Sequence, residues 1–166
     1  MEKLKDIYLP KGFFIRLYKK ISGHPDYIFY KAVATHKKYR KAKDEKNLVL
    51  MLIYGLKANK YASKYNLELW GKYGEKLKLS HGNIVINSKS IIGDNVMLRG
   101  NNCIAGKDGK APKIGNNVEI GFGTVVIGDI EIADNIIIGA NSFVNKDFKE
   151  KGVVIAGCPA KIIKRK

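Results

Sequence analysis

Ile-Gly-Asn-Asn-Val-Glu at residues 114–119 and Ile-Gly-Phe-Gly-Thr-Val at residues 120–125 decide the fold that we expect for this chain. An aliphatic residue opens each six-residue unit, and the same spacing recurs on both sides. The series is Ile86, Ile92, Leu98 and Ile104, then, after a break, Ile114, Ile120, Val126, Ile132, Ile138 and Val144. A period of six fits neither the roughly 3.6 residues of a helical turn nor the alternation of a single strand.

Such a period predicts a solenoid in which each unit forms one short strand and a turn. Three units close one triangular coil, and the aliphatic side chains stack inward from coil to coil. Residues 107–113 add four residues to the repeat, so we expect them to bulge from one corner as a loop. Leu67, Leu69, Leu77 and Leu79 alternate with polar residues ahead of the repeats, and Trp70 is expected to cap the axis.

These repeats resemble those of hexapeptide-repeat acyltransferases, whose fold is a left-handed parallel β-helix. Ala-Gly-Cys-Pro-Ala-Lys-Ile-Ile at residues 156–163 resembles the closing segment of that family, and His-Gly-Asn-Ile-Val-Ile-Asn at residues 81–87 resembles the catalytic-histidine coil of its serine acetyltransferase branch. The resemblance covers residues 66–166. It implies a mainly β domain at 66–166, acetyl-CoA as the acetyl donor, and a homotrimer with CoA grooves between neighbouring subunits.

His81 is the only histidine among the repeats. Acyl transfer to a hydroxyl needs a base that can hold a proton near neutral pH, and imidazole suits that task. The resemblance implies that His81 deprotonates the acceptor for direct attack on acetyl-CoA; a turn histidine facing solvent is the alternative. In that branch a carboxylate about fifteen residues earlier orients the base. Position 66 is Asn66 here, so the nearby Glu68 is our candidate, with an exposed strand residue as the alternative.

Two further groups of residues are candidates for binding. Arg99 follows His81 by 18 residues, one coil, so it is expected directly over His81, where it would hold an anionic group of acceptor or donor. The resemblance places CoA along small residues and near the C-terminus, at Phe122, Gly123, Ala140, Gly157 and Lys161. No metal site is expected, since the metal-dependent β-helices use several repeat histidines.

The chain departs from serine acetyltransferases at two active-site positions. Their aspartate before the catalytic histidine is Ser80 here, and their second histidine is Ala111. Because both groups would hold the charged ends of an amino acid, we expect the acceptor to be a sugar hydroxyl, as in a capsular or lipid-linked glycan. The alternatives are a divergent serine acetyltransferase and a β-helical scaffold without catalysis.

The chain has 166 residues and a formal net charge of +16, and residues 1–65 hold 16 Lys+Arg against 5 Asp+Glu. Such a surface attracts anions, although no nucleic-acid motif accompanies it. No apolar run approaches the roughly 20 residues that span a bilayer. Cys103 and Cys158 are expected to be reduced thiols, which favours a cytoplasmic protein.

The basic region 1–65 is expected to be a helical extension. Phe13, Phe14, Leu17, Tyr18 and Ile21 lie on one face of a first helix, and that face either packs within the protein or rests on a membrane surface. Helices are predicted from Tyr27 to Ala42 and from Asn47 to Tyr65, the latter with an apolar stripe of Leu48, Met51, Leu52 and Leu56. Asp26 is expected to cap the second helix, and His24 and His36 to be surface or capping residues.

Overall fold

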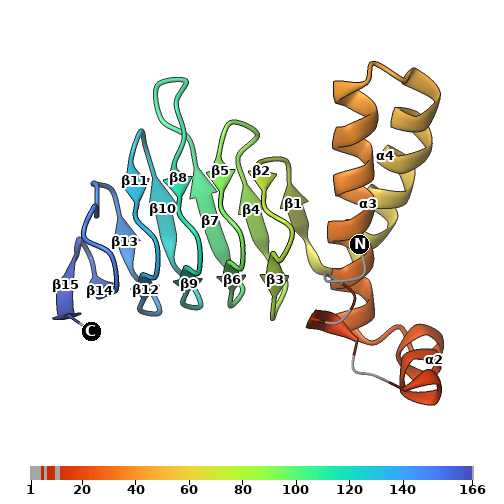
Figure 1. The fold of residues 1–166 in the computed structure, drawn as a ribbon, viewed down its shortest axis with the longest axis horizontal. Coiled ribbons are helices and arrows are strands. Elements are labelled where there is room, and N and C mark those ends of the chain that lie inside the picture. The colour runs from red at the N-terminus through yellow and green to blue at the C-terminus, as the bar shows by residue number, and fades with distance from the viewer. Residues whose placement is uncertain (1–4, 6, 10–11, 166) are drawn as a thin grey trace. The chain divides into compact units, whose positions relative to one another are not determined.

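The computed structural model describes residues 5, 7–9 and 12–165 of the chain. The chain divides into two compact units, Met1–Leu67 and Glu68–Lys166, which we describe separately. The first is helical and the second is a solenoid of short strands (Figure 1). Lys166 lies outside the described residues.

Three α-helices and one short 3₁₀ helix of the first unit are described. These are α2 (Phe13–Ile21), α3 (Pro25–Asp44), α4 (Leu48–Ala62) and the 3₁₀ helix η1 (Ser63–Tyr65). The predicted helices are therefore confirmed, with ends shifted by a few residues. None of the described helices is both long enough and apolar enough to cross a bilayer.

The start of α3 differs in detail from the prediction. Pro25 occupies the first turn, where its missing N–H costs nothing. The cap is His24, whose Nδ1 accepts a hydrogen bond of 3.3 Å from the backbone N–H of Asp26. Asp26 is thus inside the helix, and its predicted capping role is wrong. His36 is buried rather than at the surface, and burial, with a smaller effect from Arg40, lowers its pKa to about 4.

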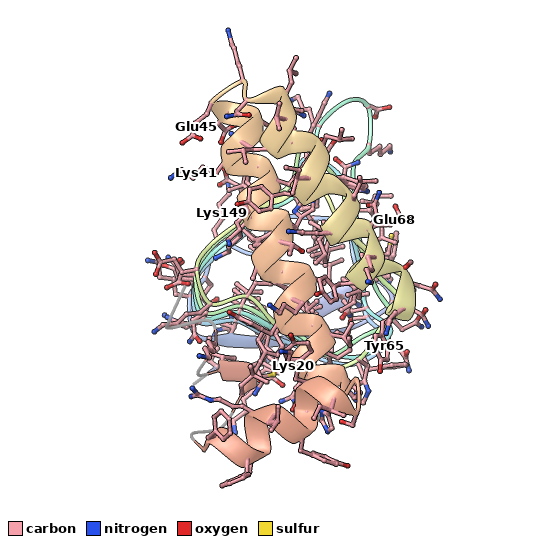
Figure 2. The ribbon with its side chains drawn as sticks, turned by 90° about the vertical axis from the view of Figure 1, so that its right-hand side faces the viewer. Lys20, Lys41, Glu45, Tyr65, Glu68 and Lys149 are labelled. Atoms are coloured by element: carbon pink, nitrogen blue, oxygen red, sulfur yellow. The ribbon has the colours of Figure 1, made fainter. Side chains whose placement is uncertain are left out.

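Packing within the helical unit depends on α3, which contacts α4 along its length. The buried side chains of α3 are Ile28, Phe29, Ala32, Val33, Ala34, His36 and Ala42. Lys41 and Glu45 lie together near the end of α3, 3.7 Å apart (Figure 2). The apolar stripe of α4 is largely exposed, since Leu48 is 75% and Leu52 65% accessible.

The second unit is a parallel β-helix with three sheets, one per face (Figure 1). The first sheet contains β1 (Leu67–Leu69), β4 (Ile84–Ile86), β7 (Asn102–Ala105), β10 (Val125–Ile127) and β13 (Phe143–Val144). The second sheet contains β2 (Lys72–Tyr73), β5 (Ile91–Ile92), β8 (Lys113–Ile114) and β11 (Glu131–Ile132). The third sheet contains β3 (Lys78–Leu79), β6 (Met97–Leu98), β9 (Glu119–Ile120), β12 (Ile137–Ile138), β14 (Val153–Gly157) and β15 (Ala160–Arg165).

The predicted aliphatic residues form the core. Every member of the series from Ile86 to Val144 is at most 3% exposed. Partners in neighbouring coils stack directly, as Leu98 on Ile120 and Ile120 on Ile138. Burying one such side chain stabilises the fold by about 1.5–3 kcal/mol, so the column along the axis holds the solenoid together.

Asparagines turn the chain at the corners. Asn95, Asn117 and Asn135 occupy equivalent positions with φ between 54° and 62°, a conformation that asparagine tolerates better than most residues. Their side chains bond to one another from coil to coil, at 2.8 Å between Asn95 and Asn117 and at 3.1 Å between Asn117 and Asn135. This ladder aligns successive coils at the corner between the second and third sheets.

Two other expectations for the solenoid have different outcomes. The predicted loop is present at residues 107–112, closed by a bridge between Lys107 and Lys110, and Lys113 already belongs to β8. The prediction that Trp70 caps the axis is wrong, because Trp70 is 45% exposed while Leu67, Leu69 and Tyr73 are buried. After the last coil, β15 pairs antiparallel with β14.

Adjacent isoleucines of β5 test the core directly. Ile92 is 2% and Ile91 is 48% exposed. Ile92→Ala should lower the free energy of unfolding by about 2–5 kcal/mol, because it leaves a cavity in the axial column. Ile91→Ala should change it by no more than about 0.5 kcal/mol. Urea unfolding of both variants checks this, and equal losses would contradict the assignment of inward and outward faces.

Candidate functional site

His81 lies in the turn between β3 and β4, at the corner that joins the third sheet to the first. Its side chain is exposed, whereas Leu79 and Ile84 on either side of the turn point into the core. The turn ends at Asn83, whose φ of 55° reverses the chain toward β4. The fold therefore presents the imidazole on the outside of a rigid corner.

Gly100 of the next coil lies directly against His81. A Cβ atom on Gly100 would come within 2.4 Å of the His81 Cβ, and the φ of Gly100 is 111°, so glycine is required there on both counts. Asn102, only 1% exposed, holds this backbone in place. Its Oδ1 accepts from the Gly100 N–H at 2.9 Å, and its Nδ2 donates to the Gly121 carbonyl at 2.7 Å.

The aromatic ring of Phe122 packs against the imidazole. The ring centroids of His81 and Phe122 are 6.2 Å apart, and the planes meet at 81°, an edge-to-face contact. Phe122 is itself 49% exposed. His81 thus has its Cβ against the Gly100 backbone and its exposed imidazole beside the Phe122 ring.

The predicted stacking of Arg99 over His81 is wrong by one residue. Leu79 pairs with Leu98, 19 residues later, because the turn that follows Leu79 is one residue longer than the turn that follows Leu98. Gly100 therefore takes the place expected for Arg99. The Arg99 guanidinium instead pairs with Glu119, with Nη2 at 2.7 Å and Nε at 2.8 Å from the same carboxylate oxygen.

Glu68 lies on β1 with its side chain exposed on the outer surface of the first sheet. Among the described residues, no hydrogen bond or ion pair joins Glu68 to His81. Its carboxylate does act on Cys103 of β7: burial, and secondarily the charge of Glu68, raise the pKa of that thiol. The structure therefore does not pair the predicted orienting carboxylate with the base.

The predicted CoA positions gather along the corner that carries His81. A Cβ on Gly121 would come within 2.5 Å of the Ala140 backbone, so Phe122 and Ala140 lie on adjacent coils of this corner. Gly123 and Gly157 have φ values of 72° and 105°. The Gly157 N–H donates to the Ser142 hydroxyl at 3.3 Å. Lys161 of β15 pairs with Ala156, beside Gly157.

Two buried hydroxyl groups form hydrogen bonds to the backbone at this corner. Thr124 and Ser142, 0% and 2% exposed, both donate to the Gly139 carbonyl, at 2.9 and 2.7 Å. These residues and the Gly100–Asn102 pair were not among the predicted site residues. The sequence does contain a feature that could have identified them. Inward positions of the repeat are usually apolar, but three of them are polar here: Asn102, Thr124 and Ser142.

The chain resembles known transferases over its repeat half. Residues 111–146 match the family described as "Bacterial transferase hexapeptide (six repeats)". The serine acetyltransferases of Staphylococcus epidermidis and Staphylococcus aureus are each 36% identical over 99 residues, which cover 57% of this chain and 46% of each relative. The chain thus spans about half the length of these relatives.

Solved structures share the fold. Serine acetyltransferase from Brucella abortus strain S19 has a TM-score of 0.71 at 24% identity, covering 83% of this chain and 57% of that one. Soybean serine acetyltransferase has a TM-score of 0.70 at 24% identity, covering 82% and 58%. The predicted resemblance to hexapeptide-repeat transferases is confirmed. The repeat half of the chain therefore resembles the hexapeptide-repeat family of bacterial transferases, which residues 111–146 match, and it has the β-helix fold of the serine acetyltransferases compared above.

Proposed function

We propose that this protein is an O-acetyltransferase that moves an acetyl group from acetyl-CoA to a hydroxyl, with His81 as the general base. The observation that carries the proposal is the exposed imidazole, fixed by Gly100 and Phe122, at the head of a row of small residues. The similarity to serine acetyltransferases supports the same reaction type.

The reaction proceeds by direct attack. His81 takes the proton of the acceptor hydroxyl as its oxygen attacks the thioester carbonyl carbon. The carbon–sulfur bond then breaks, and the imidazolium returns the proton to the departing CoA sulfur. No group on the enzyme is acetylated, and the acetyl ester and free CoA are the products.

The row at Phe122, Gly123, Ala140 and Gly157 is proposed to receive the pantetheine arm. Small side chains and positive φ leave backbone accessible to an extended chain. Lys161, exposed at the end of the row, would meet a CoA phosphate. Two solved structures of serine acetyltransferases are complexes with CoA, which supports a CoA site in this fold.

Glu68 remains a proposed orienting group, one that would act on His81 only after a rearrangement or through a water molecule. Arg99, whose pair with Glu119 leaves both side chains partly exposed, remains a proposed contact for an anionic part of acceptor or donor. We also propose a homotrimer, since a triangular solenoid offers three flat faces and the groove would be completed by a neighbour.

The leading candidate acceptor is L-serine, because the relatives named above are serine acetyltransferases. This favours the alternative over the sugar acceptor that the sequence first indicated. A sugar hydroxyl remains the second candidate, on a specific observation. Position 80 is a serine and position 111 is an alanine that is only 8% exposed. Neither side chain is charged, so neither can form an ion pair with the ammonium or carboxylate group of an amino acid.

Replacing the base should separate catalysis from binding. His81→Ala should lower kcat by about 10²–10⁴-fold, the usual contribution of a positioned base. Acetyl-CoA affinity and folding should be nearly unchanged, because His81 is not among the proposed CoA contacts and its side chain lies outside the core. Single-turnover transfer and CoA calorimetry measure both effects, with His24→Ala as the control histidine. Glu68→Gln should give a smaller loss; near-normal transfer by His81→Ala would refute the proposal.

Gly100 tests how closely His81 must be placed. Gly100→Ala adds a methyl group that would lie 2.4 Å from the His81 Cβ, so the imidazole must move. A displacement near 1 Å costs about 100-fold in rate, so kcat should fall by that order. Gly152→Ala is the matched control, since its φ is 72° but nothing lies within 4 Å. Equal activity of the two variants would show that the position of His81 does not matter.

The acceptor is decided by direct competition. Thiol release from acetyl-CoA should be faster with L-serine than with free hexoses or nucleotide-linked sugars at equal concentration. The comparison of kcat/KM across these acceptors is the measurement. Turnover with a sugar about tenfold above that with serine would reverse the order of the two candidates, while no turnover with any hydroxyl would favour the scaffold alternative.

A further inference from the structure

Helix α2 exposes nearly all of its apolar side chains. No residue of this nine-residue helix is buried, whereas seven residues of α3 are. Phe14 is 81%, Ile21 77%, Phe13 74% and Tyr18 66% exposed. Together with Leu17, these side chains occupy one face of the helix at helical spacing. An apolar face of this kind on a short helix indicates a surface with which it associates.

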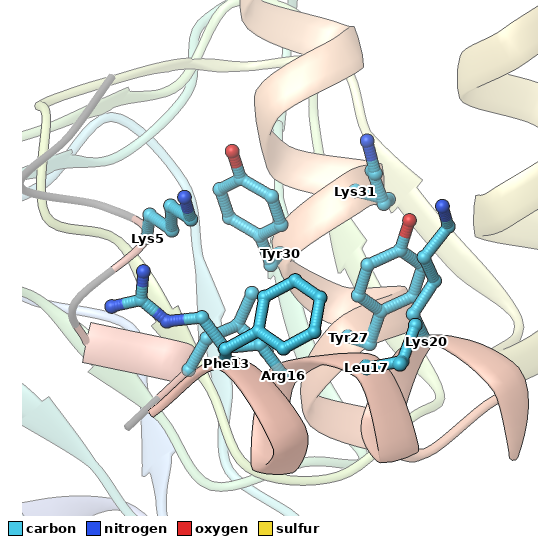
Figure 3. A pocket seen from close by; sticks show the side chains of 9 residues that line it. Lys5, Phe13, Arg16, Leu17, Lys20, Tyr27, Tyr30 and Lys31 are labelled. Atoms are coloured by element: carbon cyan, nitrogen blue, oxygen red, sulfur yellow. The ribbon is translucent and has the colours of Figure 1, made fainter. Parts of the chain in front are cut away.

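A basic hollow adjoins this face. Its volume is about 510 Å³, and it is lined by Lys5, Leu9, Phe13, Arg16, Leu17, Lys20, Tyr27, Tyr30 and Lys31. Figure 3 shows the four cationic side chains around the rings of Phe13, Tyr27 and Tyr30. Phe13 and Leu17 belong both to the apolar face and to the hollow, so the two features are continuous.

The hollow carries positive charge without a carboxylate in its lining. Asp26 is the only acidic residue between positions 12 and 31, and Lys19, which does not line the hollow, pairs with it. Lys31 lies 5.5 Å from the Tyr27 ring and 5.8 Å from the Tyr30 ring. Burial raises the pKa of both tyrosines above its usual range, and their protonated hydroxyl groups can donate hydrogen bonds at neutral pH, as an unshifted tyrosine would.

We propose that α2 and the adjoining hollow form a binding site for an anionic phospholipid bilayer, with the apolar face in the interface and a lipid phosphate in the hollow. Lysine, arginine and tyrosine donors suit a phosphate, and aromatic side chains beside them suit the boundary between headgroups and acyl chains. The excess of 16 basic over 5 acidic residues in the first 65 positions adds long-range attraction to such a surface. The site lies in the helical unit, so it operates whichever hydroxyl the chain acetylates.

The test uses the full chain and vesicles of phosphatidylcholine, either alone or with about 30% phosphatidylglycerol. Cosedimentation should show binding at least about tenfold stronger to the anionic vesicles, and the difference should shrink as salt screens the charges. Phe14→Ser and Lys20→Glu should each weaken this binding by about tenfold, the first through lost apolar burial and the second through charge reversal.

Matched controls come from α4. Leu48→Ser removes an apolar side chain that is 75% exposed, and Lys60→Glu reverses an exposed charge. Both should leave vesicle binding within about twofold, and circular dichroism should show all four variants folded. The proposal is overturned if the protein binds both vesicle types equally. It is also overturned if the α4 variants bind anionic vesicles as weakly as the α2 variants do. It is also overturned if Phe14→Ser abolishes self-association without altering vesicle binding, because a second copy of the chain would then cover α2.

Discussion

The column of aliphatic side chains along the solenoid axis is the interaction on which the structure of the repeat half depends. Each coil has little core of its own, and it is stable because it covers its neighbour. In the third sheet, Leu98, Ile120 and Ile138 stack one above the other and are at most 1% exposed. This stacking sets the register of every coil. The turns adapt to it, and the position of each outward side chain follows from the number of residues in its turn.

That dependence explains both the success and the error of the sequence analysis. The period of six is a property of inward positions, so it predicted the sheets, the core and the loop at 107–113. The period did not predict the number of residues in the turn that carries His81. The spacing from Leu79 to Ile86 is seven residues, whereas that from Leu98 to Ile104 is six. The extra residue moves Gly100, rather than Arg99, against the imidazole, and comparison of those two spacings would have revealed it.

The helical half shows a different limit. Its helices could be located from apolar spacing and turn residues, but spacing does not say what covers an apolar face. The face of α2 and the stripe of α4 look like core in the sequence, yet Phe14 and Leu48 are 81% and 75% exposed. The cap of α3 was misassigned for a related reason, since either His24 or Asp26 offers an acceptor and only the backbone decides which is used.

The same difference between inward and outward positions explains why the fold constrains the identity of the acceptor only weakly. Residues that hold the coils together point to the axis, whereas His81 and Phe122 project from a corner and Lys161 is exposed on β15. A substitution at a corner, such as serine at position 80, does not alter the packing of the core. The stacking therefore constrains the fold strongly and the acceptor weakly. Likeness to serine acetyltransferases over 99 residues consequently supports acetyl transfer more firmly than it supports serine, because a corner residue can change without disturbing the stacked core.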